Sequence, residues 1–430
     1  MLARPGSTEE VAAILRFAGQ HRLGVVPYAG GTGLVGGQTG QGPASILLSV
    51  ERMDAVRALD PADGTMIAEA GLILADVHKA AGSVDRMFPL ALASGGSARI
   101  GGLLATNAGG VQVLRYGNAR ALCLGLEAVL PDGSVLHGLT RLHKDNTGYD
   151  LRDLLIGAEG TLGVITAACL RLFPQPAEEA TALVAVPGPE AALALLTRAR
   201  AVLGETLSAF ELIARQSLIF LAEAGIDLPM PFDSPTPWMV LIQAGGGHGS
   251  AVAARAEQAL TDALAAGEAT DAVVAQNARQ AADFWEMRER IPEANRKIGA
   301  VASHDIAVPV SSVPAFIAAG EARVAAVDPA LRINAFGHLG DGNLHYNVFP
   351  PAGGDRAAFS HRRTAATAAV HGLVREMGGS ISAEHGIGRL KAAELAATGD
   401  PGKLAAMRAI KRALDPMGIM NPGAVLSPRT

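Results

Sequence analysis

The 430-residue sequence has little cysteine, few aromatic residues and few charges. Its two cysteines, Cys123 and Cys169, are too few for a disulfide framework or a cysteine-rich metal cluster. Their scarcity fits a reducing compartment, and we expect a cytoplasmic protein. Charged residues make up 18% of the chain, and the formal net charge is −5. Because no long basic run is present, nucleic acid is a poor candidate partner.

Long hydrophobic runs are also missing, although 49% of the residues are hydrophobic. No apolar run approaches the roughly 18 to 20 residues that span a bilayer, and the N-terminus resembles neither a signal peptide nor a basic presequence. The sequence therefore predicts no membrane span. At roughly 150 residues per domain, the length predicts two or three domains with sizeable cores.

Glycine is the residue in excess, with 51 in 430 positions, or about 12% against a usual value of about 7%. The glycines are clustered, for example at 29–42, 94–110, 157–163, 337–342 and 378–388. Clustered glycine marks places where the backbone takes positive φ or approaches a ligand closely. Several such loops in one chain indicate a large ligand held by main-chain groups.

Hydrophobic periodicity and turn residues predict a mixed α+β chain without regular βαβ alternation. The composition changes near residue 175, which indicates a domain boundary there. We predict helices at 8–20 and 72–81, a mostly helical stretch at 251–296 and a helix at 355–377; strands are predicted at 24–27, 46–53, 65–71, 122–138 with a turn at 131–133, 160–174, 304–310 and 331–349.

The first glycine loop contains a GxGxxG pattern at Gly31, Gly33 and Gly36. That pattern indicates a nicotinamide dinucleotide site only when a helix follows it, and here the chain continues through more glycine to a strand. The Rossmann interpretation is therefore rejected. What remains is a run of unhindered N–H groups able to wrap an anion, or a loop without function. Two further glycine tracts, 94–110 and 156–166, favour the ligand interpretation.

Together with FGHLGDGNLH and SAEHGIG, these three tracts resemble those of the FAD-linked 2-hydroxy-acid dehydrogenases of the vanillyl-alcohol oxidase superfamily. The chain is most similar to the enzymes that act on D-2-hydroxyglutarate, D-lactate and glycolate. The resemblance covers essentially the whole chain and implies an α+β fold. It implies a two-part FAD-binding domain at 1–174, an α+β substrate or cap domain with a metal site at 175–385, and a small C-terminal helical part at 386–430 that packs back toward the flavin.

By this resemblance the first loop holds the diphosphate of FAD, the other tracts line the rest of the cofactor, and Asn421 reaches the isoalloxazine edge. The first loop has no histidine, so the FAD is expected to be non-covalent. The implied cofactor-binding residues are Gly30, Gly31, Thr32, Gly33, Leu34, Ser94, Ile100, Gly101, Thr106, Asn107, Glu159, Gly163, Ile165 and Asn421.

His338 and His345 flank a predicted turn at 340–343. If Leu339 pairs with Leu344, the two histidines lie directly opposite each other with Cβ atoms roughly 5 Å apart, which suits two ligands of one metal ion. Glu384 is the best third ligand, and two imidazoles with a carboxylate leave open positions on a divalent ion, for which this donor set favours Zn²⁺. A histidine pair taken alone is more often structural.

The remaining site residues come from the same resemblance. His385 is the expected general base, Asn347 contacts the substrate, and Arg288 holds its carboxylate. D-2-hydroxyglutarate dehydrogenases carry a Thr and a Lys at the positions of Pro292 and Ser303, which weakens the expectation of a second substrate carboxylate.

His304 could supply the positive charge that is lost where the relatives' Lys is replaced by Ser303. Relatives also have several dozen residues before the segment with which this sequence begins.

The sequence thus predicts FAD-dependent oxidation of a D-2-hydroxy acid, of the D-2-hydroxyglutarate or D-lactate type, to the 2-oxo acid. A protein or quinone electron acceptor is expected, and a homodimer is possible. Two alternatives stay open: a zinc hydrolase that uses His338, His345 and Glu384, and a flavin-binding protein without turnover.

Overall fold

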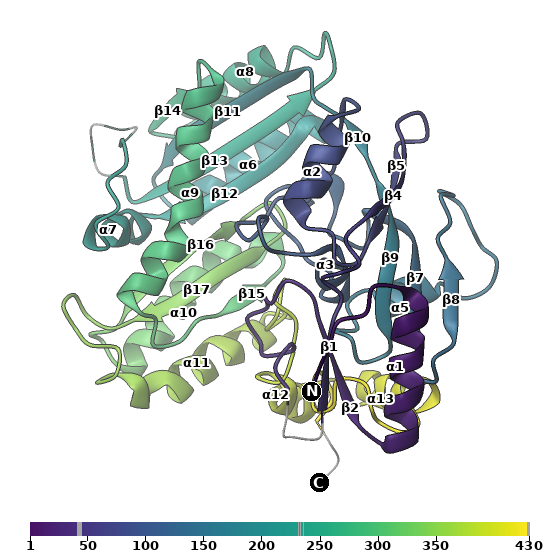
Figure 1. Cartoon of the computed structure of the whole chain (residues 1–430). Coiled ribbons are helices and arrows are strands. Elements are labelled where there is room, and N and C mark those ends of the chain that lie inside the picture. The colour runs from purple at the N-terminus through teal and green to yellow at the C-terminus, as the bar shows by residue number, and fades with distance from the viewer. Residues whose placement is uncertain (41–44, 231, 233, 235, 428–430) are drawn as a thin grey trace. The chain divides into compact units, whose positions relative to one another are not determined.

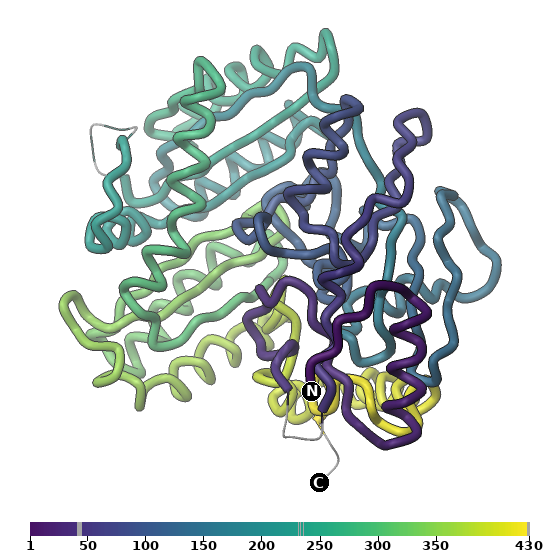
Figure 2. Tube along the Cα trace, in the orientation of Figure 1, coloured from purple at the N-terminus to yellow at the C-terminus, as the bar shows by residue number. Residues whose placement is uncertain are grey.

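The structure is a computed structural model that describes residues 1–40, 45–230, 232, 234 and 236–427. The chain divides into two compact units (Figures 1 and 2). The first unit consists of residues 1–110, 116–175 and 384–430, and the second of residues 111–115 and 176–383. The break at 175/176 lies one residue from the predicted boundary. Residues 386–430, expected as a separate part, belong to the first unit.

The first unit contains a small parallel sheet of order β1-β3-β2 and a five-stranded antiparallel sheet of order β4-β5-β9-β7-β8. Its elements are β1 (Leu2–Ala3), α1 (Thr8–His21), β2 (Gly24–Tyr28), β3 (Ser45–Ser49), β4 (Val56–Asp60), β5 (Thr65–Glu69), α2 (Leu74–Gly82), β6 (Arg86–Met87), α3 (Ile100–Ala105), β7 (Cys123–Val129), β8 (Val135–Gly138), α5 (Leu151–Leu155), β9 (Val164–Arg171), β10 (Phe173–Pro174), α12 (Ala392–Thr398) and α13 (Pro401–Leu414).

Local sequence signals explain the first helix and the turn between β7 and β8. The Ser7 side chain accepts a hydrogen bond from the Glu10 amide and so caps α1, whose buried face carries Val11 and Leu15. The turn takes Gly133 to a φ of +82°, and Val129 then pairs with Val135. The helix and the hairpin confirm the predictions for 8–20 and 122–138.

The C-terminal segment of the first unit returns to one of its first strands. Val25 of β2 forms a parallel bridge with Met420, and Val25 exchanges backbone hydrogen bonds with Ile419 and Asn421, each 2.7 Å long. In Figure 2 the yellow C-terminal trace accordingly lies beside the purple N-terminal trace. The first unit is therefore built from both ends of the described chain.

The second unit is a seven-stranded sheet of order β14-β11-β13-β12-β16-β17-β15 covered by helices on both faces (Figure 1). Its elements are β11 (Glu178–Val186), α6 (Pro189–Leu203), η1 (Gly204–Thr206), β12 (Leu207–Ala214), α7 (Arg215–Glu223), β13 (Trp238–Gly246), α8 (Val252–Ala265), β14 (Asp271–Val274), α9 (Ala278–Ile298), β15 (Asp305–Ala307), η2 (Val310–Ser312), α10 (Val313–Val327), β16 (Arg332–His338), β17 (Asn343–Phe349), η3 (Ser360–Arg362) and α11 (Arg363–Glu376). The short helix α4 (Val113–Tyr116) joins the units in sequence.

Alternation along the strands gives the two faces of this sheet separate cores. Val184 and Leu212 pack in a large core with α6, α8, α10 and α11, whereas Leu183 and Ile213 pack in a smaller core with α7 and α9. We call the side covered by α7 and α9 the α9 face. Because side chains alternate along a strand, His338 and His345 point to the α9 face, as Phe336 and Phe349 do.

The prediction that 251–296 is mostly helical is confirmed by α8 and α9, but a strand separates the two helices. α8 ends before Gly267, which has a φ of +72°, and β14 follows as an edge strand. The β-branched pair Val273 and Val274 favours that strand. In the C-terminal helix prediction, 355–377, the α-helix begins only at Arg363.

One stretch of the described residues, Val310–Val327, has the length and apolar composition of a membrane-spanning helix, which the sequence analysis did not anticipate. Its charged residues are few, Glu321 and Arg323. The stretch forms η2 and α10, and Val313, Phe316 and Ile317 are buried in the large core of the second unit. About a third of the stretch, 33%, is buried within the unit.

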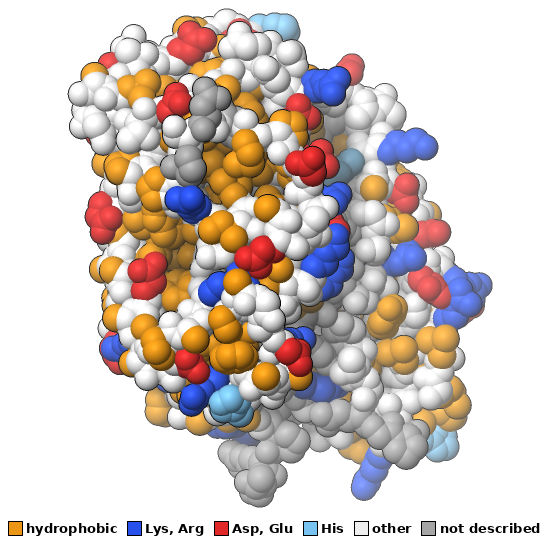
Figure 3. All heavy atoms as spheres, turned by 90° about the vertical axis from the view of Figure 1, so that its left-hand side faces the viewer, with side chains coloured by type: hydrophobic (Ala, Val, Ile, Leu, Met, Phe, Trp, Pro, Cys, Tyr) orange, Lys and Arg blue, Asp and Glu red, His pale blue; other side chains and the backbone are white. Residues whose placement is uncertain are grey.

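Acidic and basic side chains are interspersed over the face shown in Figure 3, with apolar side chains between them. This mixture fits the small net charge of −5.

Candidate active site

A pocket of the first unit encloses about 970 Å³ of space, part of it open to solvent. Main chain from all three predicted glycine tracts forms its wall, and so does His385. The predicted cofactor-binding residues that line it are Gly30, Gly31, Thr32, Gly33, Gly101, Thr106, Glu159, Gly163, Ile165 and Asn421. The tracts at 29–42, 94–110 and 156–166 are thus brought together around one cavity.

Glycine at these positions allows close packing behind the pocket wall. A Cβ on Gly30 would lie 2.3 Å from the Ser97 carbonyl oxygen, and one on Gly163 would lie 2.8 Å from that of Val129. Gly31 has a φ of +69°. Because side chains are excluded there, backbone groups face the cavity, as a ligand with an anionic diphosphate requires.

The first loop continues through turns and bends to residue 40, without a helix, and the predicted strand at 46–53 appears as β3. Within the described residues, no helix follows the glycines as a Rossmann site would require. Residues 41–44 lie outside the described residues.

Other predicted cofactor residues lie outside the pocket lining. Ile100 is buried in the hydrophobic core, Leu34 is 66% exposed, and the Ser94 carbonyl accepts hydrogen bonds from the Ser97 and Ala98 amides. Asn107, with a φ of +50°, accepts a hydrogen bond from the Arg120 amide through Oδ1. Of these four residues, Ser94 and Asn107 hold loop backbone through their hydrogen bonds.

Glu159 anchors the C-terminal segment that carries His385. Its two carboxylate oxygens accept hydrogen bonds of 2.7 Å from the amides of Ile387 and Gly388. Burial raises the pKa of Glu159, while these amides and the charges of Lys391 and Arg389 act in the opposite direction. Although Glu159 borders the pocket, its carboxylate is engaged in holding the 387–388 backbone.

Asn421 has a comparable structural role. Its Nδ2 donates to the carbonyl oxygens of Gly37 and Glu159, and its Oδ1 accepts a hydrogen bond of 2.6 Å from Arg389. Asn421 is 2% exposed and has a φ of +42°. The side chain therefore fastens the first glycine loop to the C-terminal segment at the pocket wall.

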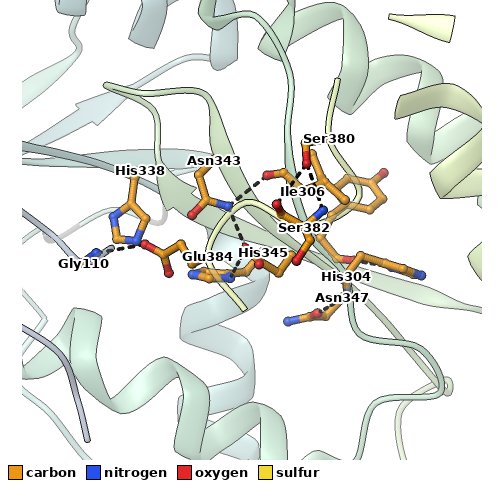
Figure 4. Close-up of polar contacts among 12 residues, drawn as sticks. Gly110, His304, Ile306, His338, Asn343, His345, Asn347, Ser380, Ser382 and Glu384 are labelled. Carbon is orange, nitrogen blue, oxygen red and sulfur yellow. Dashed lines mark hydrogen bonds and ion pairs between the residues drawn. The ribbon is translucent and has the colours of Figure 1, made fainter. Parts of the chain in front are cut away.

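Glu384 belongs to the first unit, whereas His338 and His345 belong to the second. Within the first unit, Glu384 Oε1 accepts a hydrogen bond of 3.0 Å from the Gly110 amide (Figure 4). This contact places its carboxylate at the end of the second glycine tract.

The predicted register of the histidine hairpin is wrong by two residues. Phe336, not His338, lies opposite His345, and His338 lies opposite Glu211 of β12. The turn begins earlier than expected, since the His338 carbonyl accepts from the Asp341 and Gly342 amides. A shift of two residues preserves the face, because side chains alternate with period two.

The two imidazoles consequently still lie together on the α9 face (Figure 4). Their ring centroids are 5.7 Å apart and their planes are inclined by 76°. His338 is buried and His345 half-buried. Two neighbouring imidazoles of this kind fit the donor chemistry of Zn²⁺.

Sequence reasoning missed Glu211, a fully buried carboxylate in β12. Its Oε1 lies 2.5 Å from His338 Nδ1, and its Oε2 accepts a hydrogen bond of 2.7 Å from Arg288 Nε. Burial acts to raise the pKa of Glu211, but His338 and Arg288 lower it to about 2. The available signal was a single acid within the otherwise apolar stretch AFELIA.

Arg288 extends from α9 on the same face and is 5% exposed. Its guanidinium carbon lies 4.9 Å from the centroid of the Phe336 ring. Because the hydrogen bond to Glu211 uses Nε, the two terminal Nη groups, which bind carboxylates end-on, take no part in it. Its neighbour Arg290 pairs with Glu293 at 3.0 Å and is partly exposed, as a solvated helix arginine would be.

His345 has an acidic neighbour in Asp305 of β15, with Nδ1 and Oδ1 3.9 Å apart. The same Asp305 oxygen accepts a hydrogen bond of 2.9 Å from Asn343 Nδ2. Asn347 accepts a hydrogen bond from the His304 amide, as Figure 4 shows.

The side chain of His304 does not replace the missing positive charge on the α9 face. Its Nδ1 lies 2.7 Å from the Tyr346 carbonyl oxygen, and its ring stacks edge-on against His371 of α11 at 5.1 Å. It is therefore directed toward the opposite side of the sheet. Pro292 lies inside α9, and Ser303 is exposed.

Comparison with known proteins agrees with a flavin-dependent class. Residues 1–138 match the family model for an FAD binding domain, and residues 175–425 match that of FAD linked oxidases, C-terminal domain. In fold the chain resembles p-cresol methylhydroxylase with a TM-score of 0.76 at 16% identity, over 99% of this chain and 88% of that one. The α+β fold of the vanillyl-alcohol oxidase type is thus confirmed.

Among curated proteins, the chain is 39% identical over 433 residues to mitochondrial D-2-hydroxyglutarate dehydrogenase of Bos taurus, covering 99% of this chain and 76% of the relative. It is 37% identical over 422 residues to D-2-hydroxyglutarate dehydrogenase of Xanthomonas citri pv. viticola, covering 98% and 88%. The chain belongs to this family of FAD-linked dehydrogenases and is an FAD-dependent oxidoreductase. The zinc hydrolase alternative is set aside.

Proposed function

We propose that this enzyme oxidises a D-2-hydroxy acid to the 2-oxo acid, with a divalent ion bound by His338, His345 and Glu384. The flavin-binding fold alone does not determine the substrate, because proteins of other chemistry share it. The proposal therefore depends on side chains of the second unit. Two imidazoles 5.7 Å apart share the α9 face with the buried Arg288. Paired nitrogen ligands and a cation suit a substrate with a hydroxyl and a carboxylate.

FAD, held by the pocket of the first unit, supplies the acceptor for the hydride that leaves C2 of the substrate. A divalent ion, for which this donor set favours Zn²⁺, would supply Lewis-acid polarisation of a hydroxyl or carboxylate oxygen. The residues of this chain do the rest. His338 and His345 provide neutral imidazole donors, and Glu384 provides an anionic one.

His385 is the proposed general base. It lies in the wall of the flavin pocket, where Glu159 fixes the backbone two residues away through the Ile387 amide. An imidazole is the side chain best suited to take a hydroxyl proton near neutral pH. We assign its role as removal of the proton from the substrate hydroxyl.

Arg288 and Asn347 are the proposed orienting groups. The Nη groups of Arg288 bind the C1 carboxylate, and the Phe336 ring beneath the guanidinium keeps it in place. Asn347 lies two residues from His345 on the same strand face, where its Nδ2 is able to donate to a substrate oxygen. Fixing the substrate in this way brings C2 within reach of its acceptor.

For the substrate we propose D-2-hydroxyglutarate or D-lactate. The relatives' names favour the first. Pro292, exposed Ser303 and inward-turned His304 favour a substrate without a second carboxylate, since they offer no cation beside Arg288. We further propose that a protein or a quinone would accept the electrons that FAD would receive.

An anaerobic titration tests the proposal. The purified flavoprotein receives D-2-hydroxyglutarate, D-malate, D-lactate or glycolate, with and without a chelator, while flavin absorbance near 450 nm is followed. Bleaching by one of these acids that stops after metal removal supports it. Bleaching that survives complete metal removal refutes the role of the ion, and a flavin that none of them bleaches refutes the substrate class and favours the non-catalytic alternative.

A further inference from the structure

Glu211 is buried beneath two of the proposed site residues and is almost fully excluded from solvent. Its carboxyl side chain is 1% exposed, that of Arg288 7% and that of His338 8%. Burying a carboxylate is costly unless charge and hydrogen bonds compensate. The two carboxylate oxygens of Glu211 have different partners: Oε1 contacts His338, and Oε2 accepts a hydrogen bond from Arg288.

The contact at His338 determines which ring nitrogen carries the proton. A neutral imidazole carries one N–H and one bare nitrogen, and a carboxylate accepts but cannot donate. With Glu211 Oε1 2.5 Å from Nδ1, the proton of neutral His338 resides on Nδ1. Nε2 is then the bare nitrogen, in the form that a metal ion requires.

The contact at Arg288 has a separate consequence. Arg288 Nε donates to Oε2 at 2.7 Å while its guanidinium rests against Phe336, so two contacts fix the plane of the guanidinium. A fixed plane aims the Nη pair in one direction, which a bidentate carboxylate contact needs.

We infer that Glu211 is a positioning residue that fixes the Nδ1–H form of His338 for metal binding and, through its second oxygen, the orientation of Arg288 for the substrate carboxylate. This inference rests on the proposed function. It extends that proposal to a residue that touches neither ion nor substrate.

Glu211→Gln tests this role because the amide has one accepting oxygen where the carboxylate has two. Gln cannot accept from both His338 Nδ1–H and Arg288 Nε–H, so at least one contact is lost. Affinity for Zn²⁺, measured on the metal-free flavoprotein by competition with a chromogenic chelator, is the first readout. The KM for the substrate that bleaches the wild-type flavin is the second.

We expect zinc affinity about 10- to 100-fold lower in Glu211→Gln, the usual effect of removing an outer carboxylate partner of a ligating histidine. Arg288→Lys keeps the positive charge beside Glu211 and is expected to raise KM while zinc affinity stays within twofold of wild type. Glu127→Gln is the matched control, since Glu127 is also a buried carboxylate paired with an arginine, but in the first unit. It should leave zinc affinity unchanged.

Should Glu211→Gln not fold, Glu211→Asp keeps the charge and shortens the side chain by one methylene, which prevents it from spanning both partners. It should show the same loss of zinc affinity. Unchanged zinc affinity and unchanged KM in a folded Glu211 variant overturn the inference. A wild-type protein that binds no divalent ion instead refutes the metal site of the proposed function, so the two failures are distinguishable.

Discussion

Replacing Tyr346 by Phe should stabilise the second unit, because its hydroxyl is buried in an apolar core. Tyr346 is 0% exposed, packs edge-on against Phe316 at 5.3 Å and, among the described residues, has no hydrogen-bond partner for its Oη. Burial and the charge of Glu321 raise the pKa of this phenol well above its ordinary value. The hydroxyl therefore stays neutral but unsatisfied.

An unsatisfied buried polar group costs about 1 to 3 kcal/mol, and Tyr346→Phe removes the hydroxyl while retaining the ring. For a unit of about 200 residues, each kcal/mol raises Tm by roughly 2 to 4 °C, so we expect a rise in Tm of about 2 to 12 °C. Differential scanning calorimetry of the holoprotein measures it. Flavin reduction should persist, since Tyr346 and His345 lie on opposite faces of β17.

Tyr149→Phe is the control for this experiment, because Tyr149 is 94% exposed and its hydroxyl is solvated. We expect a change in its Tm of less than 1 °C, since surface substitutions usually stay within about 0.5 kcal/mol. A Tyr346→Phe protein that is no more stable than wild type would refute the reasoning, because it would mean that the hydroxyl is satisfied in the folded state.

Further predictions concern the first unit and the chemistry. Burial acts to raise the pKa of Glu127, but hydrogen bonds from Thr8, Thr166 and Arg57 lower this pKa on balance. The ionised carboxylate therefore stabilises the folded protein fully at a pH above the ordinary carboxyl pKa. This stabilisation is lost as the pH falls through the lowered pKa of the folded state. Urea unfolding of wild type and Glu127→Gln should therefore differ at pH 7 and converge in acid; a gap that widens in acid contradicts this. His385→Ala should keep its flavin spectrum but reduce flavin about 10²- to 10⁴-fold more slowly in stopped flow; an unchanged rate removes His385 as base. Glu159→Gln should lose one charge-assisted hydrogen bond to the 387–388 backbone, which is worth about 1.5 to 3 kcal/mol. The variant should therefore release FAD more readily on dilution, which flavin fluorescence measures. Retention of FAD equal to that of wild type would show that this hydrogen bond does not support the pocket.

Local signals in the sequence predicted most of the first unit. The Ser7 cap, the turn at Gly133 and the glycine tracts are all short-range patterns, and the structure forms a helix, a hairpin and one pocket from them. Rejection of the Rossmann interpretation also depended on a local fact, the absence of a helix after Gly36.

What the sequence could not supply depends on long-range pairing. The predicted hairpin register was wrong because the turn was placed one residue too late. His338 and His345 still lie on one face because side chains alternate along a strand with a period of two residues. Glu211 meets Arg288 across 77 positions of sequence, and no local pattern predicts that contact. Glu159 and Asn421 have polar side chains beside the pocket, yet tertiary hydrogen bonds direct these side chains to backbone groups.

The bridge between Val25 and Met420 has a consequence for biosynthesis. Residues 176–383 are contiguous and are able to collapse as soon as they leave the ribosome, whereas β2 must wait for a segment made almost 400 residues later. Until residues 384–430 have been made, Glu159 lacks its partners Ile387 and Gly388, and neither His385 nor Asn421 is present. Tight flavin capture should therefore be a late, post-translational event, and nascent chains would keep an open edge at β2 for chaperones to shield.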